Sequence, residues 1–302
     1  MIMNQPIRVR CSRALTSATR QAAAALLIVL LAFSPADAAT RALKFPPPHS
    51  TAYSHDQEIQ IGRQSVAEVR RQMPVLPDSD PLTQYVRSLG ERLVPYVPNT
   101  ARNPRFPYEF HVVNVKEINA FALPGGPVFV NVGTIQAAEN EAQLMGVIAH
   151  EMSHVYERHG TAQATKAGYA QVGLGILGAL LGRSVGASVA RAAVGLGAGS
   201  LFLHYSRSAE SEADHVGALL MYSAGYNPRA MADFFRKLEQ RGGAGVPQFL
   251  SDHPNPGNRA QVIDALVRSL PPRQFSNGNS AQFSEIHQAA VGRSPATSPT
   301  AH

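Results

Sequence analysis

Apolar residues recur at three- and four-residue spacing along much of the chain, which predicts a mostly helical protein. The first such stretch runs from Asp56 to Met73. The second begins at Asp80-Pro81, where proline suits the first turn of a helix. Further helices are predicted from Ala209 to Gly225, from Pro228 to Gln240 and from Arg259 to Leu270.

The period changes to two between residues 104 and 132. Apolar side chains alternate with polar ones from Phe106 to Val112, and a second apolar run covers residues 128–132. Pro124-Gly125-Gly126 lies between the two runs and is typical of a tight bend. The order of elements predicts an α+β fold, mostly helical, with a small antiparallel sheet followed by another helix.

That next helix carries H-E-x-x-H at residues 150–154. His150 and His154 are four residues apart, so both imidazoles leave the same helix face and can bind one metal ion. Glu151 can reach a water on that metal without binding the metal itself. Zinc is the expected ion, because imidazole and carboxylate ligands suit it. Uncharged flanks over residues 147–156 favour a buried active-site helix over a chance copy on a solvated helix turn.

A catalytic zinc needs a third protein ligand, and several sources are open. A metzincin would have histidine six residues past His154, where this chain has Gly160. His159 falls off the ligand face of a continuous helix, so we expect it at the surface. The remaining source is a carboxylate from a later helix, in the run from Glu210 to Asp214.

Glu210 and Asp214 share a face of that helix, whereas Glu212 and His215 point elsewhere and are expected in solvent. Two carboxylates on an apolar face need a partner, and a cation is the simplest one. Two histidines, one glutamate and a water make a catalytic rather than a closed structural site. Asp214 is placed to accept the far N–H of a ligand histidine, with His150 the expected donor.

The N-terminus has the pattern of a secretory signal, which we assign to residues 1–38. Four arginines precede a twelve-residue apolar run from Ala22 to Phe33, and Ala36-Asp37-Ala38 supplies a cleavage pattern. An uncleaved anchor is the alternative, but a membrane span needs roughly 20 residues. Cleavage removes Cys11, the only cysteine, so the mature chain fits an oxidising compartment such as a bacterial periplasm.

The net charge of +6 does not indicate a nucleic-acid partner. The leader contributes +3, from four arginines and one aspartate, and the other +3 is spread without a basic cluster. Beyond the leader we expect a flexible segment over residues 39–54, a metallopeptidase domain over 55–270, and a partly disordered tail over 271–302.

Residues 161–203 are rich in glycine and alanine. One interpretation is a mobile flap, or a hairpin that touches a membrane through residues 172–203. The favoured interpretation is a pair of closely packed small-residue helices. A membrane span is not expected, because neither apolar run reaches the length of one.

Four motifs in fixed order resemble the HtpX/BepA-like zinc metallopeptidases, a gluzincin family that includes the CAAX prenyl proteases. They are N-A-F-A-L-P-G-G at 119–126, H-E-M-S-H at 150–154, S-R-S-A-E-S-E-A-D at 206–214 and H-P-N-P-G-N-R at 253–259. The resemblance implies a zincin-type fold with one Zn²⁺ per chain and Glu210 as its third ligand. It implies that His253 donates to an oxyanion or caps the zinc, and that Arg259 holds His253 or Asp214.

The resemblance also implies a substrate-binding edge strand beside the zinc, which binds an extended polypeptide through main-chain hydrogen bonds. Its residues are Asn119, Ala120, Phe121, Ala122, Pro124, Gly125 and Gly126.

The predicted function is that of a periplasmic zinc endopeptidase in protein quality control. In this hypothesis Glu151 activates a zinc-bound water, and the substrates are unfolded or misassembled polypeptides, including outer-membrane proteins. The alternative is a zinc-containing, chaperone-like assembly factor of the periplasm that cleaves little.

Overall fold

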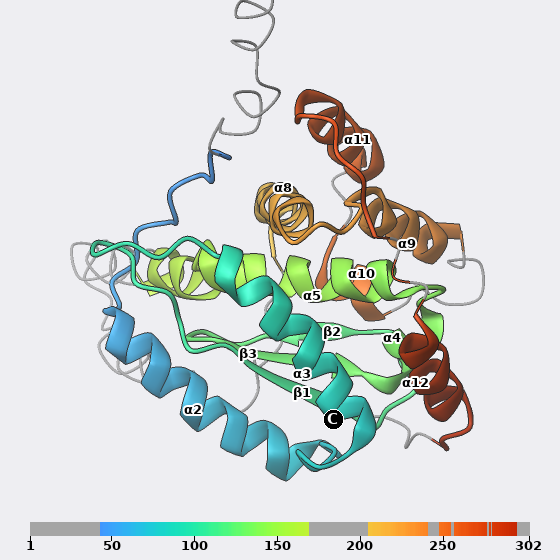
Figure 1. The fold of residues 1–302 in the computed structure, drawn as a ribbon. Helices are drawn as coiled ribbons and strands as arrows, with labels where there is room; N and C mark the ends of the chain where they lie inside the picture. Colours follow the sequence, from blue (N-terminus) through green and yellow to red (C-terminus); the bar gives the residue numbers. More distant parts are fainter. Residues whose placement is uncertain are drawn as a thin grey trace, which may run out of the picture. The chain divides into compact units, whose positions relative to one another are not determined.

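The computed structural model describes residues 43–168, 205–240, 248–254, 257–276, 278 and 280–294. All of the elements below belong to one compact unit that begins at Lys44 (Figure 1). The helices are α2 (His55–Gln72), α3 (Pro81–Leu93), α4 (Val132–Ala137), α5 (Glu141–Tyr156), α8 (Arg207–Ser223), α9 (Arg229–Gln240), α10 (Gln248–Asp252), α11 (Arg259–Ser269) and α12 (Ala281–Val291), with a short 3₁₀ turn, η2, at Val94–Tyr96. The strands are β1 (Glu109–Val113), β2 (Ala120–Ala122) and β3 (Pro127–Asn131).

The three strands form one small sheet in the order β1-β3-β2. β2 and β3 make the predicted antiparallel hairpin, with Phe121 opposite Phe129. β1 runs parallel to β3, with His111 opposite Phe129. The sheet is therefore mixed rather than wholly antiparallel, because the chain crosses from β1 to the far edge before β3 returns between them. The predicted α+β, mostly helical fold class is confirmed.

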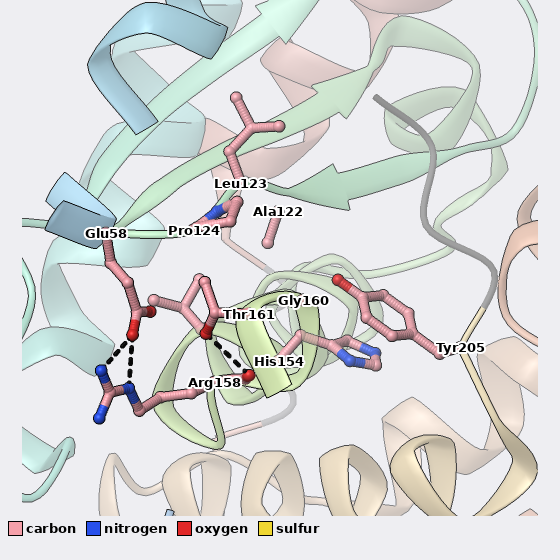
Figure 2. A pocket seen from close by; sticks show the side chains of 10 residues that line it. Glu58, Ala122, Leu123, Pro124, His154, Arg158, Gly160, Thr161 and Tyr205 are labelled. Atoms are coloured by element: carbon pink, nitrogen blue, oxygen red, sulfur yellow. Dashed lines mark hydrogen bonds and ion pairs between the residues drawn. The ribbon is translucent and has the colours of Figure 1, made fainter. Parts of the chain in front are cut away.

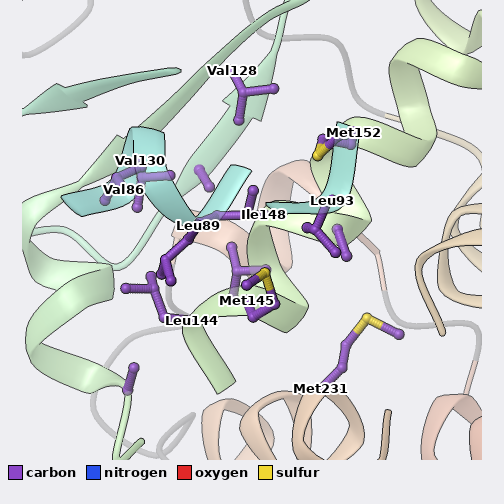
Figure 3. Packing of buried hydrophobic residues seen from close by; sticks show 14 of the residues in the cluster. Val86, Leu89, Leu93, Val128, Val130, Leu144, Met145, Ile148, Met152 and Met231 are labelled. Atoms are coloured by element: carbon purple, nitrogen blue, oxygen red, sulfur yellow. The ribbon is translucent and has the colours of Figure 1, made fainter. Parts of the chain in front are cut away.

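Each face of the sheet packs against its own helices. On one face Phe121 and Phe129 lie with Val69 of α2 in a small apolar cluster. On the other face Val128 and Val130 join the main core, together with side chains of α3 and α5 (Figure 3). Alternate residues of β3 thus face opposite sides, as the period of a strand requires.

Helix α5 is the centre of the main core. All sixteen of its residues are buried, including the three side chains of the H-E-x-x-H motif. It lies between the sheet and a second layer made by α8 and α9 (Figure 1). A helix that is apolar on all sides needs such cover, which explains its uncharged flanks.

Three short helices lie where the sequence pattern predicted none. They are α4, α10 and α12, the last of which lies in the tail that was expected to be partly disordered. The predicted signal (1–38), the Gly/Ala-rich residues 172–203 and the end of the tail lie outside the described residues. Among the residues that are described, no helix is long and apolar enough to cross a membrane.

Candidate metal centre

Helix α5 supplies His150, Glu151 and His154. Asn140 caps its N-terminus by accepting a hydrogen bond from the backbone N–H of Gln143. The Nε2 atoms of His150 and His154 are 3.0 Å apart, and both rings are buried. The two imidazoles therefore present one nitrogen each to the same point.

Helix α8 crosses α5 and brings two carboxylates to this point. Glu210 Oε2 lies 3.3 Å from His150 Nε2, and Glu210 Oε1 lies 3.4 Å from His154 Nε2. One turn further along α8, Asp214 Oδ1 is 3.1 Å from His150 Nδ1. The helices approach this closely because α8 has Gly217 at the crossing, where a Cβ would stand 3.2 Å from the backbone nitrogen of His150.

The spacing of these atoms suits a metal ion. Two ligands about 2.05 Å from a tetrahedral ion lie about 3.3 Å apart, close to the separations given above. Nitrogen and carboxylate oxygen are a donor set that zinc accepts. Among the described residues Glu210 Oε2 is buried without a hydrogen-bond partner, which a cation would supply. The residues therefore fit a bound divalent metal.

His253, just after α10, closes the cluster. Its Nδ1 lies 3.1 Å from Glu210 Oε1 and 3.3 Å from His150 Nε2, and its Nε2 lies 3.4 Å from Glu151 Oε1. Its ring stacks on Phe249 with the centroids 4.5 Å apart. One ligand atom each from His150, His154, Glu210 and His253 lies within 4.8 Å of all the others.

Arg259, the first residue of α11, holds Asp214 from behind. It donates two hydrogen bonds to the carboxylate, from Nε at 2.8 Å and from Nη2 at 2.6 Å. Its guanidinium also lies over the ring of Phe235, 3.7 Å from the centroid. Arg259 thus orients the carboxylate of Asp214, and Asp214 in turn orients the ring of His150.

Glu151 is also buried in this cluster. Neither of its carboxylate oxygens has a hydrogen-bond partner among the described residues. Burial raises the pKa of the Glu151 carboxyl above its ordinary value, because the charged form is poorly solvated there. A carboxyl group with a raised pKa beside a metal site is suited to taking up a proton.

Burial also affects the protonation of His150 and His154. It lowers the pKa of His154 well below the ordinary value, so this ring is neutral, as a metal ligand must be. At His150, burial alone would lower the pKa, but hydrogen bonds to Asp214 and Glu210 outweigh it and raise the pKa to about 9. The two carboxylates therefore demand positive charge at His150, which a metal cation on Nε2 would satisfy.

The sequence missed part of the surroundings of His154. The prediction that His159 lies at the surface is wrong, because its ring is buried and its Nδ1 is 2.9 Å from His154 Nδ1. Glu212 is partly exposed, but it pairs with His159 and His49 rather than with solvent alone. Tyr205 stacks on His154 with the ring centroids 4.0 Å apart. The only signal for His159 was its nearness to the motif.

The expected substrate-binding segment divides into two parts. Ala122 and Pro124 line a small pocket together with His154 and Tyr205 (Figure 2). β2 is an outer strand of the described sheet and contacts α5. The structure therefore places this stretch beside the metal helix.

The ends of the segment are held by other contacts. Asn119 donates to Asp252 Oδ2 at 2.8 Å. Gly125 (φ 82°) lies against α2, where a Cβ would stand 2.4 Å from the carbonyl oxygen of Glu58. Gly126 lies equally close to Pro107. Gly125 and Gly126 therefore shape the bend between β2 and β3, and Asn119 fixes the other end of the segment.

Comparison with known proteins identifies the family of the chain. Residues 81–267 match the model of peptidase family M48. This range contains His150, Glu151, His154, Glu210, Asp214, His253 and Arg259, and it covers more than half of the chain. The chain belongs to peptidase family M48.

Individual relatives carry protease names. The chain is 35% identical over 236 residues to the beta-barrel assembly-enhancing protease of Escherichia coli (strain K12), covering 75% of this chain and 47% of the relative. It is 31% identical over 241 residues to the protein of that name from Yersinia pestis, covering 77% of this chain and 48% of the relative. It is 30% identical over 235 residues to the mitochondrial metalloendopeptidase OMA1 of Saccharomyces cerevisiae, covering 72% and 65%. The chain thus spans about half the length of the first two relatives.

Proposed function

We propose that the protein is a zinc-dependent endopeptidase in which His150, His154 and Glu210 hold one Zn²⁺ and Glu151 is the catalytic base. The observation that carries the proposal is the buried convergence of three ligand atoms beside Glu151, whose carboxylate is not otherwise hydrogen-bonded among the described residues. Membership of a peptidase family and the names of the relatives support the same reaction.

When bound by His150, His154 and Glu210, the metal would supply Lewis-acid polarisation. Glu151 would take up the proton of the attacking water and pass it to the leaving amine of the cleaved peptide. Asp214 accepts the N–H of His150 and fixes the tautomer that presents Nε2, and Arg259 keeps Asp214 charged and in place. Tyr205, stacked on His154, excludes water from one side of the ligand ring.

His253 has two roles open to it in this mechanism. Its Nδ1, close to Glu210 and His150, would let it act as a further metal ligand that closes the site at rest. Its Nε2, 3.4 Å from Glu151 Oε1, would instead let it donate to an oxyanion beside that carboxylate. We propose the closed position for the arrangement described here, because Nδ1 lies closer to Glu210 than Nε2 does to Glu151.

The substrate is proposed to be an extended polypeptide that lies along β2. Residues 122–124 line the pocket beside His154, and backbone pairing with an outer strand tolerates many side chains. Such binding suits unfolded or misassembled proteins, with outer-membrane proteins as one class. The predicted signal over residues 1–38 supports a periplasmic location, and contact of residues 172–203 with a membrane stays a hypothesis.

For the layout of the chain we propose a peptidase domain over residues 55–270, preceded by the segment 39–54 and followed by the tail from 271. No observation favours a chaperone-like factor that cleaves little, so that alternative serves as an outcome of the test.

The test is cleavage of casein by the zinc-loaded mature protein and by Glu151→Gln. Loss of the base should lower kcat by roughly 10²- to 10⁴-fold while bound zinc, measured by elemental analysis, stays equal. Glu285→Gln, an exposed change on α12, is the matched control and should cleave normally. Equal cleavage by wild type and Glu151→Gln would refute the mechanism. Zinc binding without cleavage by either protein would favour the chaperone-like factor.

A further inference from the structure

Four side chains form a continuous line of hydrogen bonds that leads outward from the metal centre. His154 Nδ1 lies 2.9 Å from His159 Nδ1, on the side of the ring away from the other ligands. His159 Nε2 lies 3.2 Å from Glu212 Oε2. The same oxygen lies 2.6 Å from Nε2 of His49, in the segment before α2.

A break in the helix brings His159 into this line. α5 ends at Tyr156, Arg158 has φ 60°, and the chain is helical again from residue 159 to 168. A non-glycine residue with positive φ is uncommon and has to be held by its surroundings. Arg158 forms an ion pair with Glu58 (Figure 2). It also donates a hydrogen bond to the carbonyl oxygen of Tyr53 at 2.9 Å. The break turns the ring of His159 back toward His154.

The proton positions along the line follow from the metal site. His154 presents Nε2 to the other ligands, so the proton of the neutral ring is on Nδ1. His154 Nδ1–H therefore donates to His159 Nδ1, and His159 carries its own proton on Nε2. That proton is donated to Glu212, which also accepts from His49. Each group in the line has one consistent role.

We propose that His159 is a positioning residue, which fixes the tautomer and the orientation of the ligand His154 and is itself anchored by Glu212 and His49. This inference rests on the proposed metal site and adds a second support beside the one from Asp214 to His150. A partner on the far nitrogen of a ligand histidine raises the basicity of the ring and restricts its rotation. The hydrogen-bond partner of His154 Nδ1 is the imidazole of His159, whereas the partner of His150 Nδ1 is the carboxylate of Asp214.

The same groups, His49, His159 and Glu212, also form a donor set that a cation would accept. Two features favour the line of hydrogen bonds from His154 through His159 and Glu212 to His49, hereafter the relay, over a second ion. The His49–Glu212 separation of 2.6 Å is that of a charge-assisted hydrogen bond, well below the roughly 3.3 Å between ligands of a tetrahedral ion. In addition, Nδ1 of His159 accepts a hydrogen bond from His154, so the single proton of the neutral His159 ring is on Nε2. An ion bound at Nε2 would displace that proton and leave the ring as an imidazolate anion.

The outer end of the relay ties the N-terminal segment to the site. His49 donates its backbone N–H to the carbonyl oxygen of Glu157 at 3.2 Å, and Pro46 accepts from the hydroxyl of Tyr156 at 2.8 Å. Phe45 packs edge-on against the ring of Tyr156. These contacts all fall at the C-terminal end of α5. Residues 45–49 therefore form part of the support of the metal helix.

The test is the zinc affinity of the mature protein, measured by competition with a chromophoric chelator and independently of proteolysis. His159→Phe keeps the ring but removes the acceptor, and it should weaken zinc binding by roughly 10- to 100-fold. In His159→Asn the amide oxygen takes the place of Nδ1, so the affinity should return to within about threefold of wild type. The visible spectrum of the Co²⁺-loaded proteins should change in His159→Phe and recover in His159→Asn.

Two further variants separate the relay from general damage to the fold. Glu212→Ala changes a partly exposed residue, so it should fold even if His159→Phe does not, and it should weaken zinc binding by several-fold. His287→Phe, the same substitution on α12, is the matched control and should bind zinc as wild type does.

Each outcome decides between the proposals. Normal zinc affinity in both His159→Phe and Glu212→Ala would overturn the relay and leave the proposed function standing. Equal losses in His159→Phe and His159→Asn would show that only packing matters, and would also overturn it. A wild-type chain that binds two ions, one of which is lost in His49→Ala, would replace the relay with a second metal site. A wild-type chain that binds none would overturn the metal site and the relay together.

Discussion

Gly217 of α8 lies directly against the backbone of His150, where a Cβ would stand 3.2 Å from the nitrogen. This contact sets the distance between α5 and α8, the two helices that carry the proposed metal ligands His150, His154 and Glu210. Asp214 and Glu210 lie about one and two turns before Gly217 on the same face of α8, so any widening at the crossing moves both carboxylates away from His150.

Gly217→Val should therefore weaken both the fold and the site. Overpacking at a helix crossing costs about 1 to 3 kcal/mol, so the free energy of unfolding in urea should fall by that amount. Zinc affinity should fall as well, because the ligand separations widen. Ser211→Val on the same helix, at a half-exposed position, is the control. Unchanged zinc affinity in Gly217→Val would show that the crossing can relax without moving the ligands.

Arg259 and Asp214 form a buried pair, so removing either alone should be more harmful than removing both. Arg259→Met leaves the Asp214 carboxylate without its main partner and should cost about 3 to 5 kcal/mol in the zinc-free protein. The double variant with Asp214→Asn should recover a large part of that loss. Chemical denaturation of the two single variants and the double variant gives the coupling energy, and strictly additive effects would contradict this account.

Glu141, the first residue of α5, should contribute stability that depends on pH. Its carboxylate accepts hydrogen bonds from Tyr226 and Arg92, at 2.6 and 2.9 Å, and others from Tyr85 and Ser280. Burial alone would raise its pKa, but these hydrogen bonds and the charge of Arg92 outweigh burial and lower the pKa below the ordinary 4.5. The network joins α3, α5 and the chain around α12.

Because the folded pKa is depressed, the stabilisation is complete above the unfolded value of 4.5 and is lost as the pH falls through the folded pKa. Glu141→Gln should cost roughly 2 to 4 kcal/mol at neutral pH, and the difference from wild type should shrink below pH 4.5. Denaturation series at several pH values measure this. Glu285→Gln should show no such dependence, and a constant difference for Glu141→Gln would argue against the charged network.

Removal of the metal should lower thermal stability by mass action. At a free zinc concentration 100 times the dissociation constant, binding stabilises the folded state by about 2.7 kcal/mol. Chelation should therefore lower the melting temperature of wild type and of Glu151→Gln by similar amounts, since Glu151 is not a proposed ligand. His150→Ala should show little response to the chelator. A full response in His150→Ala would remove that residue from the ligand set.

The hydrophobic pattern predicted α2, α3, α8, α9, α11 and the hairpin of β2 and β3, because these elements depend on local periodicity. Asp80 and Pro81 mark the start of α3, and Gly225 (φ 83°) follows the end of α8, as the sequence indicated. The spacing of His150, Glu151 and His154 likewise predicted a shared helix face, because four residues make about one turn. These features depend only on residues that are close together in the sequence.

Only the tertiary structure determined which side chains contact the face of α5 that carries His150, Glu151 and His154. The parallel pairing of β1 with β3 depends on how the chain crosses the sheet, which no local period encodes. The sequence placed His159 at the surface because it assumed a continuous helix, but the positive φ of Arg158 depends on contacts with Glu58 and Tyr53, about a hundred residues earlier. Local spacing therefore determined the motif, and contacts distant in sequence determined its surroundings.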